Sequence, residues 1–303
     1  LGLADPVSRW LDLPNVDPEI SVRQLLNHTS GVANYTAHPD LVPAINADTS
    51  HVFSPEELAA LIGPPAFERG ARTQYTNSAF LLLGMIASRA TGRPITELWS
   101  ERLWAPLELE EVFLPGFQEP PGPVARAWTG PGAAQEVAPL GRMSLLSVGH
   151  SALGLFSNAR TVARWGRGLF AGEVLGPEIR GEMLTFVPAA GNIPGESGAG
   201  LGIRRYAYLG REQWGHSGGS PLGSSLLLYD DQSGITVVVI MNQGPGADHF
   251  VLAPRLLELA AEHVGCCAAP PVPGQARKKH GSTNEPVSTT NAGHGSVKRR
   301  HGR

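Results

Sequence analysis

The sequence predicts an α+β fold, and three observations support this prediction. Several segments between residues 21 and 172 combine helix-capping residues with apolar residues at helical spacing. After residue 200, apolar and β-branched runs are separated by short turns, as in antiparallel hairpins. An amphipathic stretch, residues 250–264, then follows. Helices in the middle, antiparallel strands late and a closing helix are typical of the α+β class.

Two short helices are predicted from capping boxes near the start of the chain. Ser21 is followed three residues later by Gln24, which predicts a helix that ends about three residues further on. Ser54 is followed by a proline and by Glu57, which predicts a second helix that ends before the Gly-Pro-Pro sequence after residue 62. Residues 28–40, between them, are expected to form a loop.

Longer helices are predicted in the middle of the chain. After Asn77, apolar residues follow helical spacing until Gly92. A further helix is expected to start at Pro94. Ser157 is the expected cap of another helix, which ends near Gly172.

The strands are predicted in the last third of the chain. Residues 203–210 and 211–217 are typical of two paired strands. Residues 224–243 contain two apolar runs about a polar turn with a glycine, which predicts a second hairpin. Residues 250–264 are predicted to form the final helix.

The composition divides the chain at residue 268. Residues 268–303 are rich in Pro, Ser, Thr and Gly and almost free of large apolar residues, so this tail is predicted to be disordered. It contains every lysine of the chain, Lys278, Lys279 and Lys298. Seven basic residues against one Glu give the tail a charge of +6; with −3 for the whole chain, residues 1–267 carry −9. Residues 1–267 are therefore predicted to be the folded domain.

Several kinds of partner are not indicated. A basic tail on an acidic domain could bind nucleic acid, but a solvated tail is the simpler interpretation. No apolar run approaches the roughly 18 to 20 residues that span a bilayer, and no signal peptide is visible at a start that lacks Met. The two cysteines, Cys266 and Cys267, are neighbours and fit neither a disulfide framework nor a zinc site. No metal or organic cofactor is implied, and compartment and oligomeric state stay open.

One short motif suggests a different enzyme class. Gly215 to Gly219 satisfies G-x-S-x-G, which would make Ser217 the nucleophile of an α/β-hydrolase with His249 or His263 as its base. That motif functions at a turn from a strand into a helix. Here it leads into another predicted strand, and no alternating strand–helix units precede it. The α/β-hydrolase interpretation is therefore not favoured.

Six stretches, in their order, resemble the serine β-lactamase and penicillin-binding protein superfamily. The similarity is to its class C-like branch of D-alanyl-D-alanine carboxypeptidases, D-aminopeptidases and β-lactamase-type esterases. The stretches are residues 4–14, 20–32, 74–94, 154–170, 215–230 and 234–243. The resemblance implies an antiparallel sheet flanked by helices beside a helical region, and a serine hydrolase that acts through an acyl-enzyme on a small-molecule or peptide substrate.

The Y-x-N element of this superfamily is matched by Tyr75 and Asn77. The resemblance implies that Tyr75 relays protons and that Asn77 binds the amide of the substrate. A purely structural interpretation is also open, in which Asn77 caps the following helix and Tyr75 packs against its first turn. His28, in the sequence His-Thr-Ser-Gly, is expected to bind the turn rather than act as a base, and His150 and Asn158 are expected to be structural.

The K-T-G or H-x-G element of the superfamily is matched by His216, Ser217 and Gly218. The resemblance implies that His216 lines the catalytic cleft, that Ser217 and Gly218 border the substrate, and that the backbone N–H of Gly219 donates to the oxyanion. Related β-lactamases carry Lys where this chain has His216. This difference favours a peptidase or an esterase over a β-lactamase.

The third element, Ser-x-x-Lys, does not occur in this sequence, because no serine is followed three residues later by lysine. In the superfamily it precedes the stretch that residues 4–14 resemble. The chain is therefore expected to begin after its own nucleophile and to lack the nucleophile helix and the first strands of the sheet. The loss is expected to expose an apolar cavity and an unpaired strand edge.

Two functions follow from this resemblance. The first is a serine hydrolase acting on D-amino-acid peptides, esters or β-lactams, whose nucleophile segment is encoded upstream. The alternative is an inactive fragment or pseudoenzyme that at most binds peptide or cell-wall ligands.

Overall fold

The computed structural model describes residues 1–267 except 130–134, 190, 192, 245 and 247, and residues Leu1–Cys266 form one compact unit. The tail predicted to be disordered, residues 268–303, lies outside the described residues, as do the side chains of both cysteines. Among the described helices, none is long and apolar enough to cross a membrane.

The largest sheet is antiparallel and six-stranded, and β10 and β5 lie at its two edges. In spatial order its strands are β10 (Ile235–Met241), β9 (Gly223–Asp230), β8 (Arg211–Ser220), β7 (Arg204–Tyr208), β6 (Glu196–Ala199) and β5 (Val187–Pro188). Two smaller pairs join β1 (Val112–Phe113) to β4 (Phe156–Ser157) and β2 (Ala127–Thr129) to β3 (Gln135–Val137).

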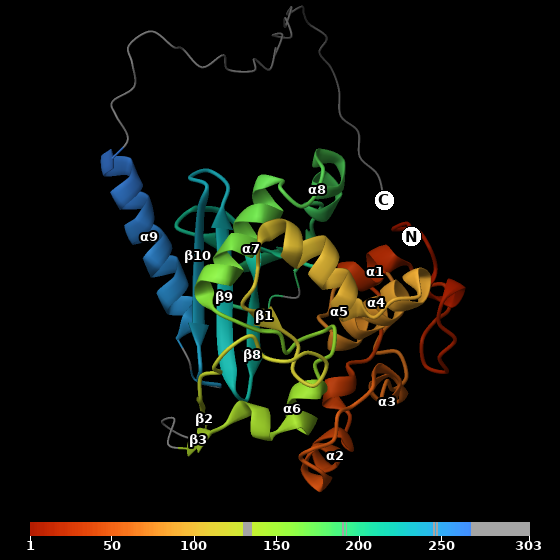
Figure 1. Ribbon diagram of the computed structural model, residues 1–303. Helices are drawn as coiled ribbons and strands as arrows, with labels where there is room; N and C mark the ends of the chain where they lie inside the picture. Colours follow the sequence, from red (N-terminus) through yellow and green to blue (C-terminus); the bar gives the residue numbers. More distant parts are fainter. Residues whose placement is uncertain (130–134, 190, 192, 245, 247, 268–303) are drawn as a thin grey trace, which may run out of the picture. The chain divides into compact units, whose positions relative to one another are not determined.

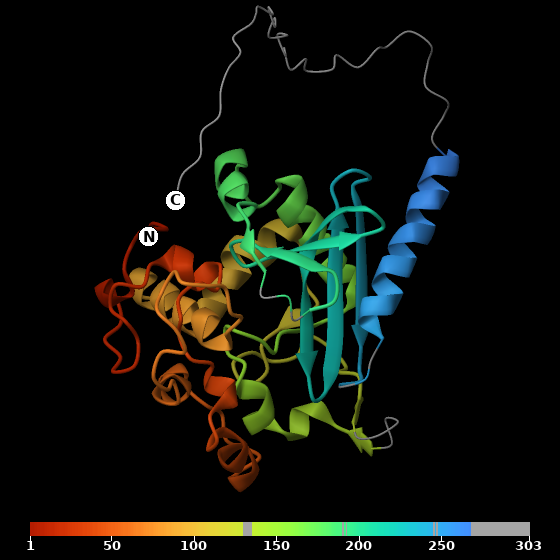
Figure 2. The same ribbon diagram turned by 180° about the vertical axis from the view of Figure 1, so that it is seen from behind.

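Helices cover both faces of the six-stranded sheet and build a separate helical region beside it (Figures 1 and 2). The helical region contains α1 (Val22–Leu26), α2 (Leu41–Ala47), α3 (Pro55–Ala60), α4 (Asn77–Thr91) and α5 (Ile95–Trp99). The other α-helices of the described residues are α6 (Met143–Ser147), α7 (Ala159–Ala171), α8 (Pro177–Met183) and α9 (His249–Cys267).

Alternation along β9 explains how the sheet is covered. Leu227 packs in one apolar cluster with Phe170 of α7, whereas its neighbours Leu226 and Leu228 pack in another cluster with Leu257 of α9. Successive side chains of a strand point to opposite faces, so α7 and α9 lie on opposite sides of the sheet. Figure 1 shows this arrangement, with α9 in blue and α7 in green.

Most predicted helix ends are confirmed. Ser21 and Ser54 each form a complete capping box. Gly92 and Gly172 end their helices in the left-handed conformation, with φ of 69° and 90°. Both paired segments of the late sheet are also confirmed as the hairpins β7–β8 and β9–β10.

The interpretation of Asn77 as a helix cap, which the sequence left open, is not supported, and the predicted cap Ser157 is wrong by one residue. The cap of α4 is Thr76, whose side chain accepts from the backbone N–H of Ser78, so Asn77 is the first helical residue. The cap of α7 is Asn158, because its Oδ1 accepts from the N–H of Thr161 at 2.9 Å. The loop expected at 28–40 contains one short 3-10 turn, Tyr35–Ala37, and α2 follows it.

The G-x-S-x-G segment lies within β8, which continues to Ser220 and turns directly into β9. The turn from strand to helix that an α/β-hydrolase nucleophile needs is not formed here. The structure therefore agrees with the rejection of that interpretation.

Candidate active site

The segment that presents Tyr75 is bound to the loop after α1. The carbonyl of His28 accepts from the N–H of Gln74 at 2.9 Å, and the carbonyl of Gly31 accepts from the N–H of Ala66 at 2.8 Å. Gly31 has a φ of +75°, and a Cβ there would lie 2.1 Å from a backbone oxygen of the bound segment. Only glycine fits this close approach, so the loop fixes the position of Tyr75 through the backbone.

The side chain of His28 also holds this segment. Its Nδ1 accepts from the N–H of Thr76 at 3.4 Å, and its ring lies 4.6 Å from the Tyr75 ring, centroid to centroid. Burial, the largest cause, lowers the pKa of His28 to about 3. The ring is therefore neutral at pH 7 with its proton on Nε2. The sequence predicts that His28 binds its own turn, but in the structure its side chain binds the backbone of the Tyr75 segment instead.

Tyr75 and Asn77 form a hydrogen-bonded pair rather than a cap. The Tyr75 hydroxyl donates to Oδ1 of Asn77 at 3.1 Å. Nδ2 of Asn77 donates to the hydroxyl of Thr36 at 3.1 Å, and its backbone N–H donates to Oδ1 of Asn34 at 3.2 Å. Burial raises the pKa of Tyr75, and the positive charge of Arg204 partly opposes this effect. Asn77 thus orients the Tyr75 hydroxyl, and both side chains are half-buried.

His216 lies across from Tyr75, on β8, with 6.1 Å between the two ring centroids. A carbonyl oxygen can only accept, so the 2.6 Å contact between His216 Nδ1 and Ser217 O places the ring proton on Nδ1. Burial and, second, Arg204 lower the pKa of His216 to about 4. At pH 7 the ring is therefore neutral, and Nε2 is a hydrogen-bond acceptor. A lysine at this position would be a donor and a cation.

The structure brings Tyr75, Asn77 and His216 together from two distant parts of the chain. Leu26, next to the His28 loop, helps to join these parts, because its carbonyl accepts from the N–H of Gly202 at 3.0 Å. Gly202 lies two residues before β7. The helical region and the sheet therefore contact each other at the place where the motif with Tyr75 and Asn77 approaches the motif with His216.

The second half of β8 extends past the end of β7. The pairing of these strands stops at Arg204 with Gly215, so residues 216–220 have no β7 partner, although β9 pairs with them on the other side. This stretch contains the predicted substrate residues Gly218 and Gly219. Backbone groups along such an edge can pair with an extended peptide-like ligand.

The glycines and Ser217 differ in their surroundings. A Cβ at Gly219 would meet no atom within 4 Å, whereas a Cβ at Gly218 would lie 2.7 Å from the Ser225 hydroxyl. Ser217 pairs with Leu226, which packs on the α9 face of the sheet, so its side chain points away from the His216 side. A role for Ser217 and for both glycines in substrate binding stays a prediction.

Arg204 and Glu196 are site residues that the sequence did not identify. The Arg204 guanidinium carbon lies 4.8 Å from the Tyr75 ring centroid, and its Nη1 pairs with Glu196 Oε1. Arg204 stands at the start of a predicted strand, beside a second arginine. The one feature of the sequence that could have pointed to an arginine in the site is the lack of lysine in residues 1–277, because arginine is then the basic side chain with a permanent charge in the domain.

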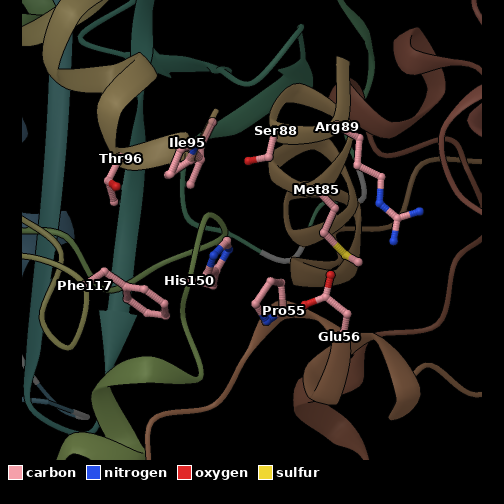
Figure 3. A pocket seen from close by; sticks show the side chains of 10 residues that line it. Pro55, Glu56, Met85, Ser88, Arg89, Ile95, Thr96, Phe117 and His150 are labelled. Carbon is pink, nitrogen blue, oxygen red and sulfur yellow. The ribbon is translucent and has the colours of Figure 1, made fainter. Parts of the chain in front are cut away.

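A cavity of about 250 Å³ lies in the helical region, apart from these residues (Figure 3). Met85, Ile95 and Phe117 line it together with His150, whose ring meets the Phe117 ring edge-on at 5.2 Å. Burial lowers the pKa of His150. None of Tyr75, Asn77 and His216 lines this cavity, and the structural role of His150 stays a prediction.

Comparisons with known proteins agree on one family. A family model described as Beta-lactamase matches residues 1–262. A D-aminopeptidase of Brucella anthropi is 34% identical over 115 residues, which are 37% of this chain and 21% of that protein. The matched part of the chain thus spans about a fifth of the length of this relative.

Two solved structures are similar over most of the chain. A D-stereospecific amidohydrolase from Streptomyces sp. is 30% identical, with a TM-score of 0.72 over 80% of this chain and 75% of the other. A D-amino acid amidase from Ochrobactrum anthropi SV3, in complex with L-phenylalanine amide, is 24% identical, with a TM-score of 0.76 over 87% of this chain and 77% of the other. At this identity, the second similarity concerns the fold alone.

Proposed function

The chain belongs to the beta-lactamase family, and from this membership we propose that its compact unit supplies the acid–base and substrate-binding groups of a serine hydrolase. The proposed substrates are amides, peptides or esters of D-amino acids, which the hydrolase cleaves through an acyl-enzyme. The observation that carries this proposal is the hydroxyl of Tyr75, which Asn77 orients where His216 approaches across the junction of helical region and sheet.

The proposed chemistry assigns a separate task to each group. A serine hydroxyl is a weak nucleophile and needs a base to take its proton. Tyr75, in its phenolate form, takes that proton and then gives it to the leaving amine, so Tyr75 is again a phenolate after acylation. Asn77 binds the substrate amide, and Nε2 of His216 accepts a hydrogen bond from the substrate. The N–H of Gly219 donates to the oxyanion.

The substrate class follows from the relatives and from His216. Two of the relatives are named a D-aminopeptidase and a D-stereospecific amidohydrolase. A neutral His216 offers no charge to a carboxylate such as that of a β-lactam antibiotic. We therefore rank linear D-amino-acid amides, peptides and esters above β-lactams.

This sequence contains no Ser-x-x-Lys element, so the proposal assigns no nucleophile within it. The test accordingly uses the complete gene product of the source organism. We expect it to release ammonia from D-phenylalanine amide and to be labelled by a fluorophosphonate probe. Tyr75→Phe should lower kcat/KM by about 100-fold or more, the usual effect of losing a general acid–base group.

The matched control is Tyr208→Phe, which removes a phenol whose hydroxyl donates to Pro194 O. This variant should keep its activity. An unchanged rate in Tyr75→Phe would remove Tyr75 from the mechanism.

The second candidate is a protein that binds such ligands without turnover, which the lack of a Ser-x-x-Lys element favours. It predicts that D-phenylalanine amide perturbs the NMR signals of Tyr75 and His216, while neither ammonia nor labelled protein forms in any preparation. Turnover by the complete gene product rules it out.

A further inference from the structure

A buried ion pair lies directly against the candidate general acid–base. Arg204 begins β7 and Glu196 begins β6, and their side chains are only 6% and 2% exposed. The guanidinium of Arg204 lies over the Tyr75 ring, with its carbon 4.8 Å from the centroid. This distance is within the range in which a cation is attracted to an aromatic face.

This ion pair is not expected to add much to the stability of the fold. Two buried charges lose their hydration, and their attraction offsets this loss only when the remaining polar atoms are also satisfied. Here Arg204 Nε and Glu196 Oε2 are both buried without a hydrogen-bond partner. A hydrophobic pair of similar size would stabilise the fold equally well, so another use of the charge is indicated.

Every ionisable group that faces Tyr75 can be assigned a charge near pH 7. His28 of the loop after α1 and His216 of β8 are neutral, since burial lowers the pKa of both. Tyr35 is neutral because burial raises its pKa. The remaining group is Arg204 with its partner Glu196, and no lysine occurs before residue 278. Arg204 is thus the cation at the Tyr75 ring in the part of the chain that the structure describes.

We propose that Arg204, held by Glu196, is a positioning residue whose fixed positive charge favours the phenolate form of Tyr75. This inference rests on the proposed function and deepens it. The phenolate takes the proton of the serine hydroxyl as the new ester bond forms. The resulting neutral phenol returns the same proton to the departing amine. Arg204 exchanges no proton, and its charge is the same before and after the step.

The test follows the ionisation of Tyr75 directly, in the chain as it stands. The five tyrosines are replaced by 3-fluorotyrosine, which ionises at lower pH than tyrosine and keeps the titration within the range where the protein is folded. The Tyr75 signal in the ¹⁹F NMR spectrum is assigned from its loss in Tyr75→Phe. In Arg204→Met we expect the titration midpoint of Tyr75 to rise by roughly one pH unit. Arg204→Lys, which keeps a cation, should restore part of this shift.

A merely structural role predicts the opposite change. Burial raises the pKa of Tyr75, so a loosened site would lower the midpoint toward that of an exposed tyrosine. Because Arg204→Met leaves Glu196 without its partner, the double variant Arg204→Met/Glu196→Gln replaces the pair by neutral groups and guards against misfolding. It should raise the midpoint as well. Arg205→Met, which removes the next arginine from its place over Phe186, should leave the midpoint unchanged.

The inference is overturned if the midpoint of Tyr75 stays constant or falls in both Arg204 variants. This readout needs no turnover, so its outcome is independent of the Tyr75→Phe rate test. In the complete gene product, Arg204→Met should move the ascending, acidic limb of the pH profile of kcat to higher pH by the same amount and leave KM unchanged. A rise in KM alone would instead identify Arg204 as a substrate-binding residue and overturn the inference.

Discussion

Two histidines beside Tyr75 are kept neutral by the fold. Burial lowers the pKa of His28 to about 3 and that of His216 to about 4, from an ordinary value of 6.5. The unfolded chain therefore binds protons at these positions at pH values where the folded protein does not. These two residues therefore leave the free energy of unfolding at its full value above about pH 6.5. They lower it as the pH falls from there toward the folded pKa values.

We expect acid to destabilise the protein through these two residues. Between about pH 6 and 4.5, each should lower the free energy of unfolding by about 1.4 kcal/mol per pH unit. Urea unfolding at several pH values measures this slope. His216→Asn removes one of the two groups and should reduce the slope by that amount, whereas His263→Asn, at an exposed position of α9, should not. Equal slopes in the wild type and His216→Asn would contradict the assignment.

At the scale of elements, the loop after α1 determines where the Tyr75 segment lies. We expect Gly31→Ala to lower the free energy of unfolding by about 2 to 4 kcal/mol, because the residue adopts a left-handed conformation and its new Cβ would overlap Phe67 O. Urea unfolding measures the change. Gly63→Ala is the control, since a Cβ there meets no atom within 4 Å. If Gly31→Ala is as stable as the wild type, the loop does not pack as closely as described.

The elements that the sequence predicted correctly are those with local causes. Ser21 and Ser54 each carry their partner three residues away, and Gly92 follows directly on an apolar helix. The sequence does not decide the cap of α4, because Thr76 and Asn77 both have an oxygen that can cap. Tyr75 and Thr36 bind the Asn77 side chain, and that tertiary choice leaves Thr76 as the cap. Strands β5 and β6, of two and four residues, are too short to show alternation.

The residues of the candidate site likewise fall into those that the sequence identified and those that it did not. Tyr75, Asn77 and His216 belong to short motifs that are visible in the sequence. Arg204 does not, because its place beside Tyr75 depends on the register of β7 against β8 and on the approach of two regions distant in sequence. No periodicity or spacing in the chain carries that information.

At the scale of the whole folded unit, α9 leaves an apolar stripe uncovered. Its inner face packs on the sheet, but five apolar side chains on the same helix are exposed. They are Val251, Leu252, Leu256, Leu259 and Val264. Beside it, β10 lies at the edge of the sheet (Figure 1). Exposed apolar patches and open strand edges both promote association between molecules.

We therefore expect separate molecules of the folded unit, residues 1–267, to associate with one another as the protein concentration rises. Replacing Leu252 and Leu259 together by Glu should weaken this association by about tenfold or more, because both side chains lose apolar area that contact would bury. Sedimentation velocity over a range of concentrations measures the effect. Glu262→Lys, at an exposed polar position of the same helix, is the control. Association that is unaffected by the double substitution would show that the stripe is not responsible.

The stretch of β8 that runs past β7 has a consequence for how this protein can change. A ligand that paired with this edge would be recognised by the peptide backbone, which does not change when side chains are substituted. Under the proposed function, changes in the neighbouring side chains would therefore leave the binding of peptide-like molecules intact, and new preferences would arise by adding bulk where space exists. Gly219 is such a place. A library of variants at this single codon would sample many selectivities while preserving the underlying scaffold.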